Sequence, residues 1–185
     1  MPAGATIVPV IIASDKTQLS TFSGDKQAWP VYLTTGNIEK CTHQKPSTHA
    51  TILLGYIPVS KLENFSKERC SVEGYQIFHD SKKIMLEPLV KAGTNGVDMG
   101  CADGFLRNIF PILLAYIADY PEQCLVTCCQ ENACPIYLVK PKERGQPIHS
   151  VLHNAETTVH ILAQQSQGLA PSEFKDYNMR PINPF

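Results

Sequence analysis

The stretch VPVIIASDKTQLS, residues 8–20, determines the fold that we predict for this chain. Its first half belongs to a run of apolar, β-branched residues, which is typical of a strand buried on both faces. The run ends in the charged pair Asp15-Lys16. A carboxylate at the exposed end of a buried strand often serves as a metal ligand or a catalytic acid, and just as often it only forms the turn that ends the strand. Both interpretations of Asp15 are kept here.

Composition favours one well-buried core. The chain has 185 residues, of which 43% are apolar, and this length is typical of one domain with a small appendage. Its 16 Lys and Arg are balanced by 17 Asp and Glu, so the formal charge is −1. This balance excludes a protein that coats nucleic acid through its overall charge.

The cysteines and the apolar runs indicate an intracellular protein without a membrane span. The sequence has seven Cys, four of them between residues 124 and 134, and its first residues lack the pattern of a signal peptide. No apolar run reaches the roughly 18 to 20 residues that a membrane span needs. The densest run, FLRNIFPILLAYIADY at 105–120, is interrupted by Arg107 and Pro111, and we predict a buried helix there.

The predicted elements begin with three strands. Polar loops join the segments TIVPVIIAS, WPVYLTTGNI and ATILLGYIPV, which favours an antiparallel meander. The segment SVEGYQIFHDSKKIMLE, residues 71–87, predicts a helix that Pro88 ends or kinks. GVDMGCADG, residues 96–104, then predicts a short strand running into Asp103, a second acid at a strand end.

The C-terminal part divides into a Cys-rich segment, a helix and a tail. CLVTCCQENACPIYLV predicts two short strands around a turn, and NAETTVHILAQQSQG predicts a helix capped by Asn154 and stopped by Gly168. The tail APSEFKDYNMRPINPF contains three Pro and predicts a linker. The predicted regions are a core at 1–123, a Cys-rich insertion at 124–153, and a helix with a Pro-rich tail at 154–185.

Three strands, a helix and a strand form the opening order of the ribonuclease-H-like fold, whose first and fourth strands lie side by side. The predicted fold class is therefore α/β, with a mixed sheet of three antiparallel strands plus a parallel strand, incomplete at the C-terminus. The strands ending at Asp15 and Asp103 should then pair in parallel. Because neighbouring strands lie about 4.8 Å apart, the two carboxylates should approach within roughly 4 to 8 Å.

Such a pair of acids suits phosphoryl transfer on a nucleic-acid backbone. Two Mg²⁺ ions about 3.5 to 4 Å apart can stabilise the attacking and leaving oxygens together. Mg²⁺ prefers oxygen ligands and keeps several waters, so two or three carboxylates suffice. A third acid from a later helix usually completes the set, and the sequence does not identify one. Asp25, Asp98 and Asp119 are rival acids, and Asp119 is expected at a helix end.

Several strings resemble the catalytic region of Plavaka-type transposases, which belong to the Kyakuja/Dileera/Zisupton group of cut-and-paste mobile elements. The strings are SDKTQLS, GDKQAWPVYLTTGNI, ATILLGYIPVSKLENFSKE, GVDMGCADGFLRNIFPILLAYIADYPEQCLV and HSVLHNAETT. The resemblance implies a nuclear, DDE-type transposase domain that cuts DNA ends and joins them to target DNA with Mg or Mn. It also implies that Asp15 and Asp103 are the first two catalytic acids and ligands of the metal.

The same resemblance extends to the Cys-rich segment. Similar transposases carry a Cys-Cys, four-residue gap, Cys-Pro-x-Cys pattern that resembles a zinc knuckle. Here Cys128, Cys129 and Cys134 match it, while Tyr137 stands where the last thiolate is expected. Structural zinc takes four ligands, so a Zn site would need one more from Cys124, His149 or His153. The alternative is a set of reduced, partly buried thiols.

Two hypotheses about function follow. The first is a fragment of a DDE-type catalytic domain that acts on transposon ends and target DNA in a longer protein, oligomerises through missing segments, and is inactive as this chain because the third acid is not present. The second is a non-catalytic, transposon-derived remnant or binding module that keeps the fold for DNA or protein contact. The near-neutral charge predicts that DNA recognition comes from other segments.

Overall fold

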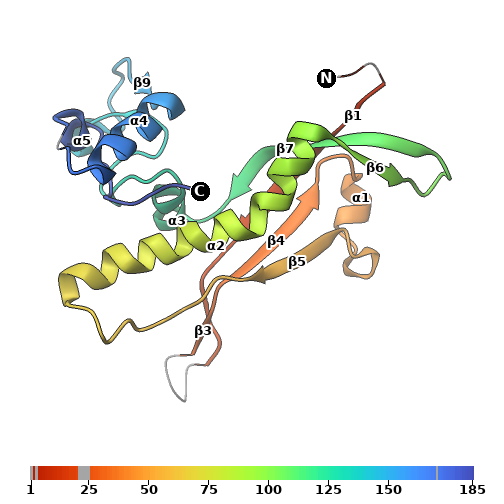
Figure 1. Cartoon of the computed structure of the whole chain (residues 1–185), viewed down its shortest axis with the longest axis horizontal. Coiled ribbons are helices and arrows are strands. Elements are labelled where there is room, and N and C mark those ends of the chain that lie inside the picture. Colours follow the sequence, from red (N-terminus) through yellow and green to blue (C-terminus); the bar gives the residue numbers. More distant parts are fainter. Residues whose placement is uncertain (1, 3, 21–25, 170) are drawn as a thin grey trace. The chain divides into compact units, whose positions relative to one another are not determined.

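The chain forms two compact units. The structure is a computed structural model that describes residue 2 and residues 4–20, 26–169 and 171–185 (Figure 1). One unit comprises Met1–Val59 and Lys82–Ala118, and the other comprises Ser60–Ser81 and Asp119–Phe185. The long helix α2 (Lys67–Asn95) contributes residues to both. The region boundaries predicted from the sequence stay predictions.

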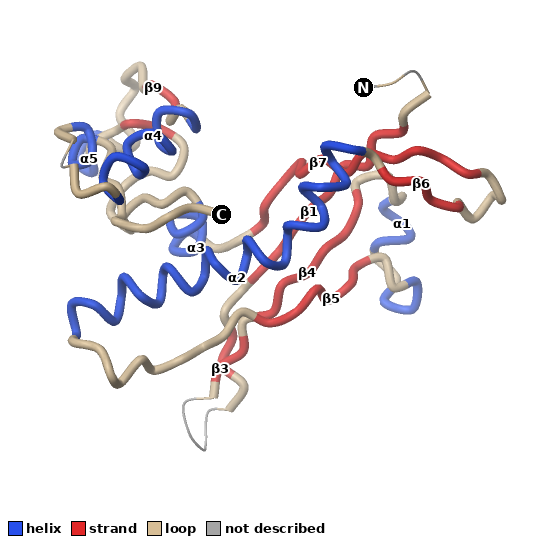
Figure 2. Tube along the Cα trace, viewed as in Figure 1, coloured by secondary structure: helices blue, strands red, loops and turns tan. Residues whose placement is uncertain are grey.

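The first unit contains a five-stranded mixed sheet with the order β5-β4-β1-β7-β6 (Figure 2). Its strands are β1 (Thr6–Ser14), β4 (Pro30–Thr35), β5 (Thr51–Tyr56), β6 (Val97–Gly100) and β7 (Leu106–Ile117). β1 pairs antiparallel with β4, and β4 with β5, which confirms the predicted meander. β1 and β7 form the parallel pair. The fold class is therefore mixed α/β.

Short elements lie between these strands. A small hairpin follows β1, and two short helices lie between β4 and β5. These elements are β2 (Thr17–Gln18), β3 (Gln27–Ala28), α1 (Lys40–His43) and the 3-10 helix η1 (Pro46–Thr48). The hairpin β2-β3 leaves the sheet directly after Asp15 and Lys16.

The part of α2 in the first unit packs against the sheet. Val10, Ile12 and Ser14 alternate along β1 as buried residues, as expected when one face of a strand is covered. The helix comes so close to β7 that a Cβ on Gly93 would lie 2.7 Å from the Pro111 carbonyl oxygen. The absence of a side chain at position 93 thus permits the close contact that buries this face.

The helix α2 is longer than predicted, and it continues through Pro88. A proline removes one helical hydrogen bond and clashes one turn back. Here tertiary burial offsets that cost, since Phe78 and Leu86 are buried on either side of the middle of the helix. The helix instead ends at Gly96, whose φ of 73° is left-handed and whose N–H donates to the Ala92 carbonyl over 2.8 Å.

The segment predicted as a buried helix at 105–120 is in fact the strand β7. A short apolar run has no periodicity that separates a buried strand from a buried helix, and pairing with β1 and β6 decides the outcome. Pro111 is tolerated because β6 pairs only with Leu106–Ile109, so Pro111 lies where β7 has lost that neighbour.

The second unit is built from short helices and a small hairpin. Its elements are α3 (Tyr120–Val126), β8 (Tyr137–Leu138), the 3-10 helix η2 (Pro141–Glu143), β9 (Val151–Leu152), α4 (Ala155–Ser166) and α5 (Glu173–Asp176). The predicted helix after Asn154 is confirmed, with the Asn154 side chain accepting from the Thr157 N–H over 3.0 Å. The first of the two predicted Cys-rich strands is wrong. The segment starts as α3, because Asp119 caps it and Pro121 fits its first turn.

The tail is packed within the second unit, so the prediction of a linker is wrong. Met179, Arg180 and Ile182 are 1%, 5% and 4% exposed. Met179 forms a β-bridge with Cys129, and the Asn183 N–H donates to the Gln76 side chain over 2.9 Å. A few apolar residues without helical or strand periodicity are enough to hold a segment that contains proline.

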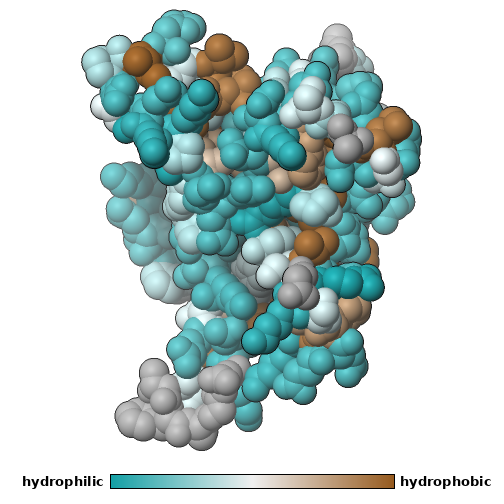
Figure 3. All heavy atoms as spheres, turned by 90° about the vertical axis from the view of Figure 1, so that its left-hand side faces the viewer, coloured by the Kyte–Doolittle hydropathy of each residue, from teal (hydrophilic) through white to brown (hydrophobic). Residues whose placement is uncertain are grey.

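Exposed apolar side chains are common. On the face drawn in Figure 3 they form separate patches within a mostly hydrophilic surface. Within the described ranges, no helix combines the length and the apolar character that crossing a membrane requires.

Candidate functional site

Asp103 lies in the turn that joins β6 to β7. Its carboxylate accepts two hydrogen bonds from the Arg107 guanidinium, over 2.8 and 2.7 Å, and one from the Phe105 N–H over 3.2 Å. The Arg107 hydrogen bond is the main reason why the pKa of Asp103 falls to about 2. Gly104 follows with a left-handed φ of 81°, as in an Asp-Gly turn. The local interactions of Asp103 are those of a turn residue.

The predicted approach of Asp15 and Asp103 is wrong. The strand that leads to Asp103 pairs antiparallel with β7, and β7, which follows Asp103, is the parallel neighbour of β1. Asp15 therefore follows the end of β1, whereas Asp103 precedes the start of β7. β1 alone has nine residues, so a length of about 30 Å separates the two ends. These two carboxylates do not form one metal site.

The register places the end of β7 beside the end of β1. Ala13 is paired with Ile117 in the parallel ladder. Asp15 lies two residues beyond Ala13, and Asp119 lies two residues beyond Ile117. Two residues span at most about 7 Å, so the peptide chain itself keeps each acid close to this last pair of the ladder. The carboxyl ends of two adjacent parallel strands thus each continue into an exposed aspartate.

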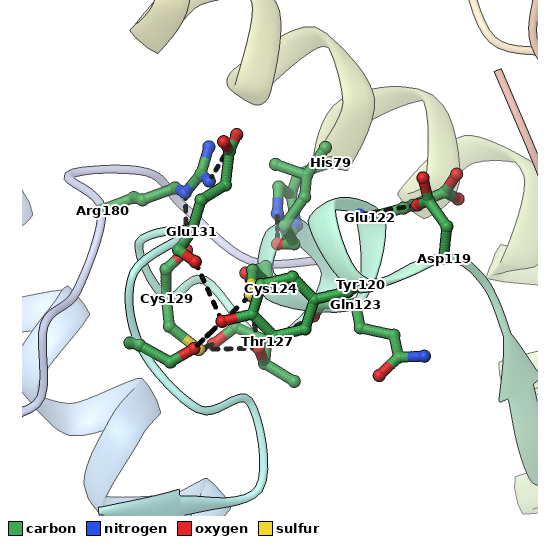
Figure 4. Close-up of polar contacts among 12 residues, drawn as sticks. His79, Asp119, Tyr120, Glu122, Gln123, Cys124, Thr127, Cys129, Glu131 and Arg180 are labelled. Carbon is green, nitrogen blue, oxygen red and sulfur yellow. Dashed lines mark hydrogen bonds and ion pairs between the residues drawn. The ribbon is translucent and has the colours of Figure 1, made fainter. Parts of the chain in front are cut away.

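Asp119 has a structural task as well. Its carboxylate accepts from the Glu122 N–H over 3.0 Å and caps α3 (Figure 4). One carboxylate oxygen makes this bond, which leaves the other oxygen for a ligand. The rival acid Asp98 accepts from the Asn108 side chain over 2.8 Å in the β6-β7 hairpin, and Asp25 lies outside the described residues.

Sequence reasoning named Asp119 but assigned it to a helix end. The signal that identifies it is the rule applied to Asp15: an acid directly after a buried strand. That rule points to Asp119 only when the apolar segment before it is taken as a strand. The sequence pattern predicts a helix for that segment, residues 105–120. The error in one element therefore concealed that Asp119 follows a strand.

The Cys-rich segment has buried thiols. Cys124, Cys128 and Cys129 are buried, and none of the seven cysteines, all of which the structure describes, forms a disulfide. Burial raises the pKa of the Cys128 thiol to about 12, which disfavours the thiolate that zinc requires. In the described part of the chain, no three His, Cys, Asp or Glu side chains are placed to hold a metal ion.

Protein contacts organise this segment. The Arg180 Nε donates to the Cys129 carbonyl over 2.6 Å, and the guanidinium also pairs with Glu131 over 3.4 Å (Figure 4). The His153 Nε2 lies 3.1 Å from the Cys134 carbonyl oxygen, and the Tyr137 N–H donates to the Cys134 sulfur over 3.4 Å. A zinc site at Cys128, Cys129 and Cys134 stays a prediction.

Comparison with known proteins gives the family. The sequence profile described as Plavaka transposase matches residues 1–185. The chain belongs to the Plavaka transposase family. Comparison with curated proteins finds no match. The Plavaka profile covers both units, so the resemblance of the sequence strings is confirmed over the full length.

Proposed function

We propose that this Plavaka family chain carries the first two acids of a metal-dependent, DDE-type transposase domain, and that these acids are Asp15 and Asp119. The observation that supports this most is the parallel register of β1 and β7. The two strands end side by side, and the chain continues from each strand end into one of the acids. The strand order β5-β4-β1-β7 and the helix α2 after β5 agree with a ribonuclease-H-like arrangement.

The donor set suits a hard divalent cation. Both acids are exposed aspartates, and carboxylate oxygens are the ligands that Mg²⁺ and Mn²⁺ prefer. Mg²⁺ often binds through one or two carboxylates, several waters and the phosphates of the substrate. When bound, such ions stabilise the attacking and leaving oxygens of a phosphoryl transfer. The task of the protein is to supply these carboxylate oxygens.

The proposed partner is DNA, at transposon ends and at the target, and the proposed location is the nucleus. The net charge of −1 gives little general attraction to phosphates. Binding would therefore depend on local contacts near the acids, where Lys16 lies directly after Asp15 with its ammonium 5.6 Å from the Trp29 ring centre. Zinc in the Cys-rich segment and assembly into oligomers remain secondary proposals.

Calorimetric titration with Mn²⁺ tests the assignment. Asp15→Asn or Asp119→Asn should weaken binding about tenfold or more, because each removes one of two charged ligands. Asn caps a helix as well as Asp does, so Asp119→Asn should leave α3 intact. Asp103→Asn is the matched control, since it removes an acid beyond the other end of β1, and it should bind Mn²⁺ as the wild type does.

Three outcomes would contradict the proposal. Wild-type Mn²⁺ affinity in Asp119→Asn would show that Asp119 is not a ligand. Weaker Mn²⁺ binding in Asp103→Asn would show that the metal binds at the β6-β7 hairpin. If the unmodified chain binds no Mn²⁺ in the millimolar range, the non-catalytic binding module is the better account.

A further inference from the structure

Lys82 is a wholly buried lysine in the first unit. Its exposed fraction is 0%. Its ammonium donates to the Ser14 hydroxyl over 3.2 Å and lies 4.6 Å from the centre of the Tyr116 ring. Burying an ammonium costs several kcal/mol before compensation by partners, and an apolar side chain of similar size usually fills such a place at lower cost. A lysine at this position therefore indicates a role beyond packing.

Two partners of Lys82 lie at the ends of the two central strands. Ser14 is the last residue of β1, and Tyr116 is the residue before the last in β7. The hydroxyl groups of Ser14 and Tyr116 are hydrogen-bonded to each other. Lys82, Ser14 and Tyr116, which we call the strand-end cluster, thus join α2 to the carboxyl ends of β1 and β7.

The strand-end cluster lies immediately before the proposed metal ligands. Asp15 follows Ser14 directly, and Asp119 follows Tyr116 after two residues. A metal site needs its ligands held within about 0.5 Å of the productive geometry by their supporting residues. A cross-link between the two strand ends supplies that support, because neither strand end can then shift without breaking a hydrogen bond of the cluster.

We propose that Lys82 is a positioning residue for the divalent-metal site, acting through Ser14 and Tyr116. This inference rests on the proposed function of Asp15 and Asp119. Lys82 contacts neither metal nor DNA, since its side chain is inaccessible. Its effect is to fix the separation of the two strand ends, each of which the peptide chain continues into one of the acids. Outer partners of this kind typically change metal affinity by about 10- to 100-fold.

The test compares three variants by Mn²⁺ titration and by the electron paramagnetic resonance spectrum of bound Mn²⁺. Lys82→Met removes the ammonium and keeps an unbranched side chain, and it should weaken Mn²⁺ about tenfold or more. Tyr116→Phe removes only the hydroxyl and retains the ring beside Lys82, so it should fold and still weaken binding several-fold. Lys83→Met is the control, because Lys83 is the exposed neighbour on the same helix.

Affinities are compared at a temperature at which circular dichroism shows each variant to be folded. A purely structural role would lower the melting temperature and leave the affinity and the spectrum of the folded protein unchanged. Wild-type affinity and spectrum in Tyr116→Phe, and in Lys82→Met if it folds, would overturn the inference, provided that Asp15→Asn weakens binding. If Asp15→Asn and Asp119→Asn also bind as the wild type does, the proposed function fails and this inference fails with it.

Discussion

Gly96, at the junction of α2 and β6, should be among the positions of the first unit least tolerant of a side chain. Its φ of 73° lies in the left-handed region. A Cβ at this position would lie 2.6 Å from the Asn108 Oδ1 and 2.7 Å from the Phe110 Cζ. The Asn108 amide can rotate away, but the Phe110 ring is only 5% exposed and has little room to move.

The cost of Gly96→Ala has two parts. A left-handed backbone costs an L-residue about 1 to 2 kcal/mol. Overpacking against a buried ring adds about 1 to 3 kcal/mol, so the expected destabilisation is about 2 to 5 kcal/mol. Gly104→Ala is the matched control, because its φ is 81° and nothing lies within 4 Å of the added Cβ. It should show the backbone part alone.

Urea unfolding followed by tryptophan fluorescence measures both variants. Trp29 is the single tryptophan of the chain and belongs to the same unit as both glycines, so its signal reports on the unfolding of that unit. The free energy of unfolding should fall further for Gly96→Ala than for Gly104→Ala by the overpacking part. Equal losses in the two variants, or a loss below about 1 kcal/mol at position 96, would refute the close contact with Phe110.

Three further predictions concern single side chains. Asp119→Ala should lower the free energy of unfolding, measured by calorimetry, by about 1 kcal/mol, because it removes the cap of α3. Asp119→Asn should leave the free energy of unfolding unchanged, because Asn also caps a helix. Arg107→Ala should raise the pKa of Asp103 from about 2, as measured by NMR titration, and an unchanged pKa would contradict the ion pair. In the wild type, the ion pair of Asp103 with Arg107 adds stability above the ordinary pKa of the carboxyl group. That stability is lost as the pH falls through about 2. Iodoacetamide should modify exposed Cys41 well before buried Cys128, whose raised pKa disfavours the thiolate, and mass spectrometry showing the reverse order would contradict the burial.

The elements that the sequence predicted correctly are those with local signals. β1 is a run of β-branched residues that ends at a charged pair, and α4 has an Asn cap at one end and a left-handed glycine after the other. These signals depend on a few neighbouring residues. Such elements are predictable because no distant contact has to be known.

The elements that were predicted wrongly depend on distant contacts. β7 is a strand because β1 and β6 flank it, and α2 passes Pro88 because its packing offsets a lost hydrogen bond. The acid pair failed for the same reason. Whether Asp103 or Asp119 follows the strand end next to the end of β1 depends on the direction of β7, and no local pattern contains that information.

The burial of Lys82 was not predicted, since a lysine within a helix is usually exposed. Its partners Ser14 and Tyr116 are 102 residues apart in the sequence. Only the parallel register brings them together. Sequence reasoning thus located the end of β1 and Asp15 after it, whereas the end of β7 beside it and the burial of Lys82 required the fold.

Broadening of amide NMR signals by Mn²⁺ tests the central claim most directly, because a bound paramagnetic ion removes the signals nearest to it. We expect the amides of Asp15, Lys16, Asp119 and Tyr120 to broaden first as Mn²⁺ is added, and those of Gly104 and Phe105 to stay sharp. Selective broadening of Gly104 and Phe105, with Asp15 and Asp119 unaffected, would contradict the assignment of the metal site to the carboxyl ends of β1 and β7.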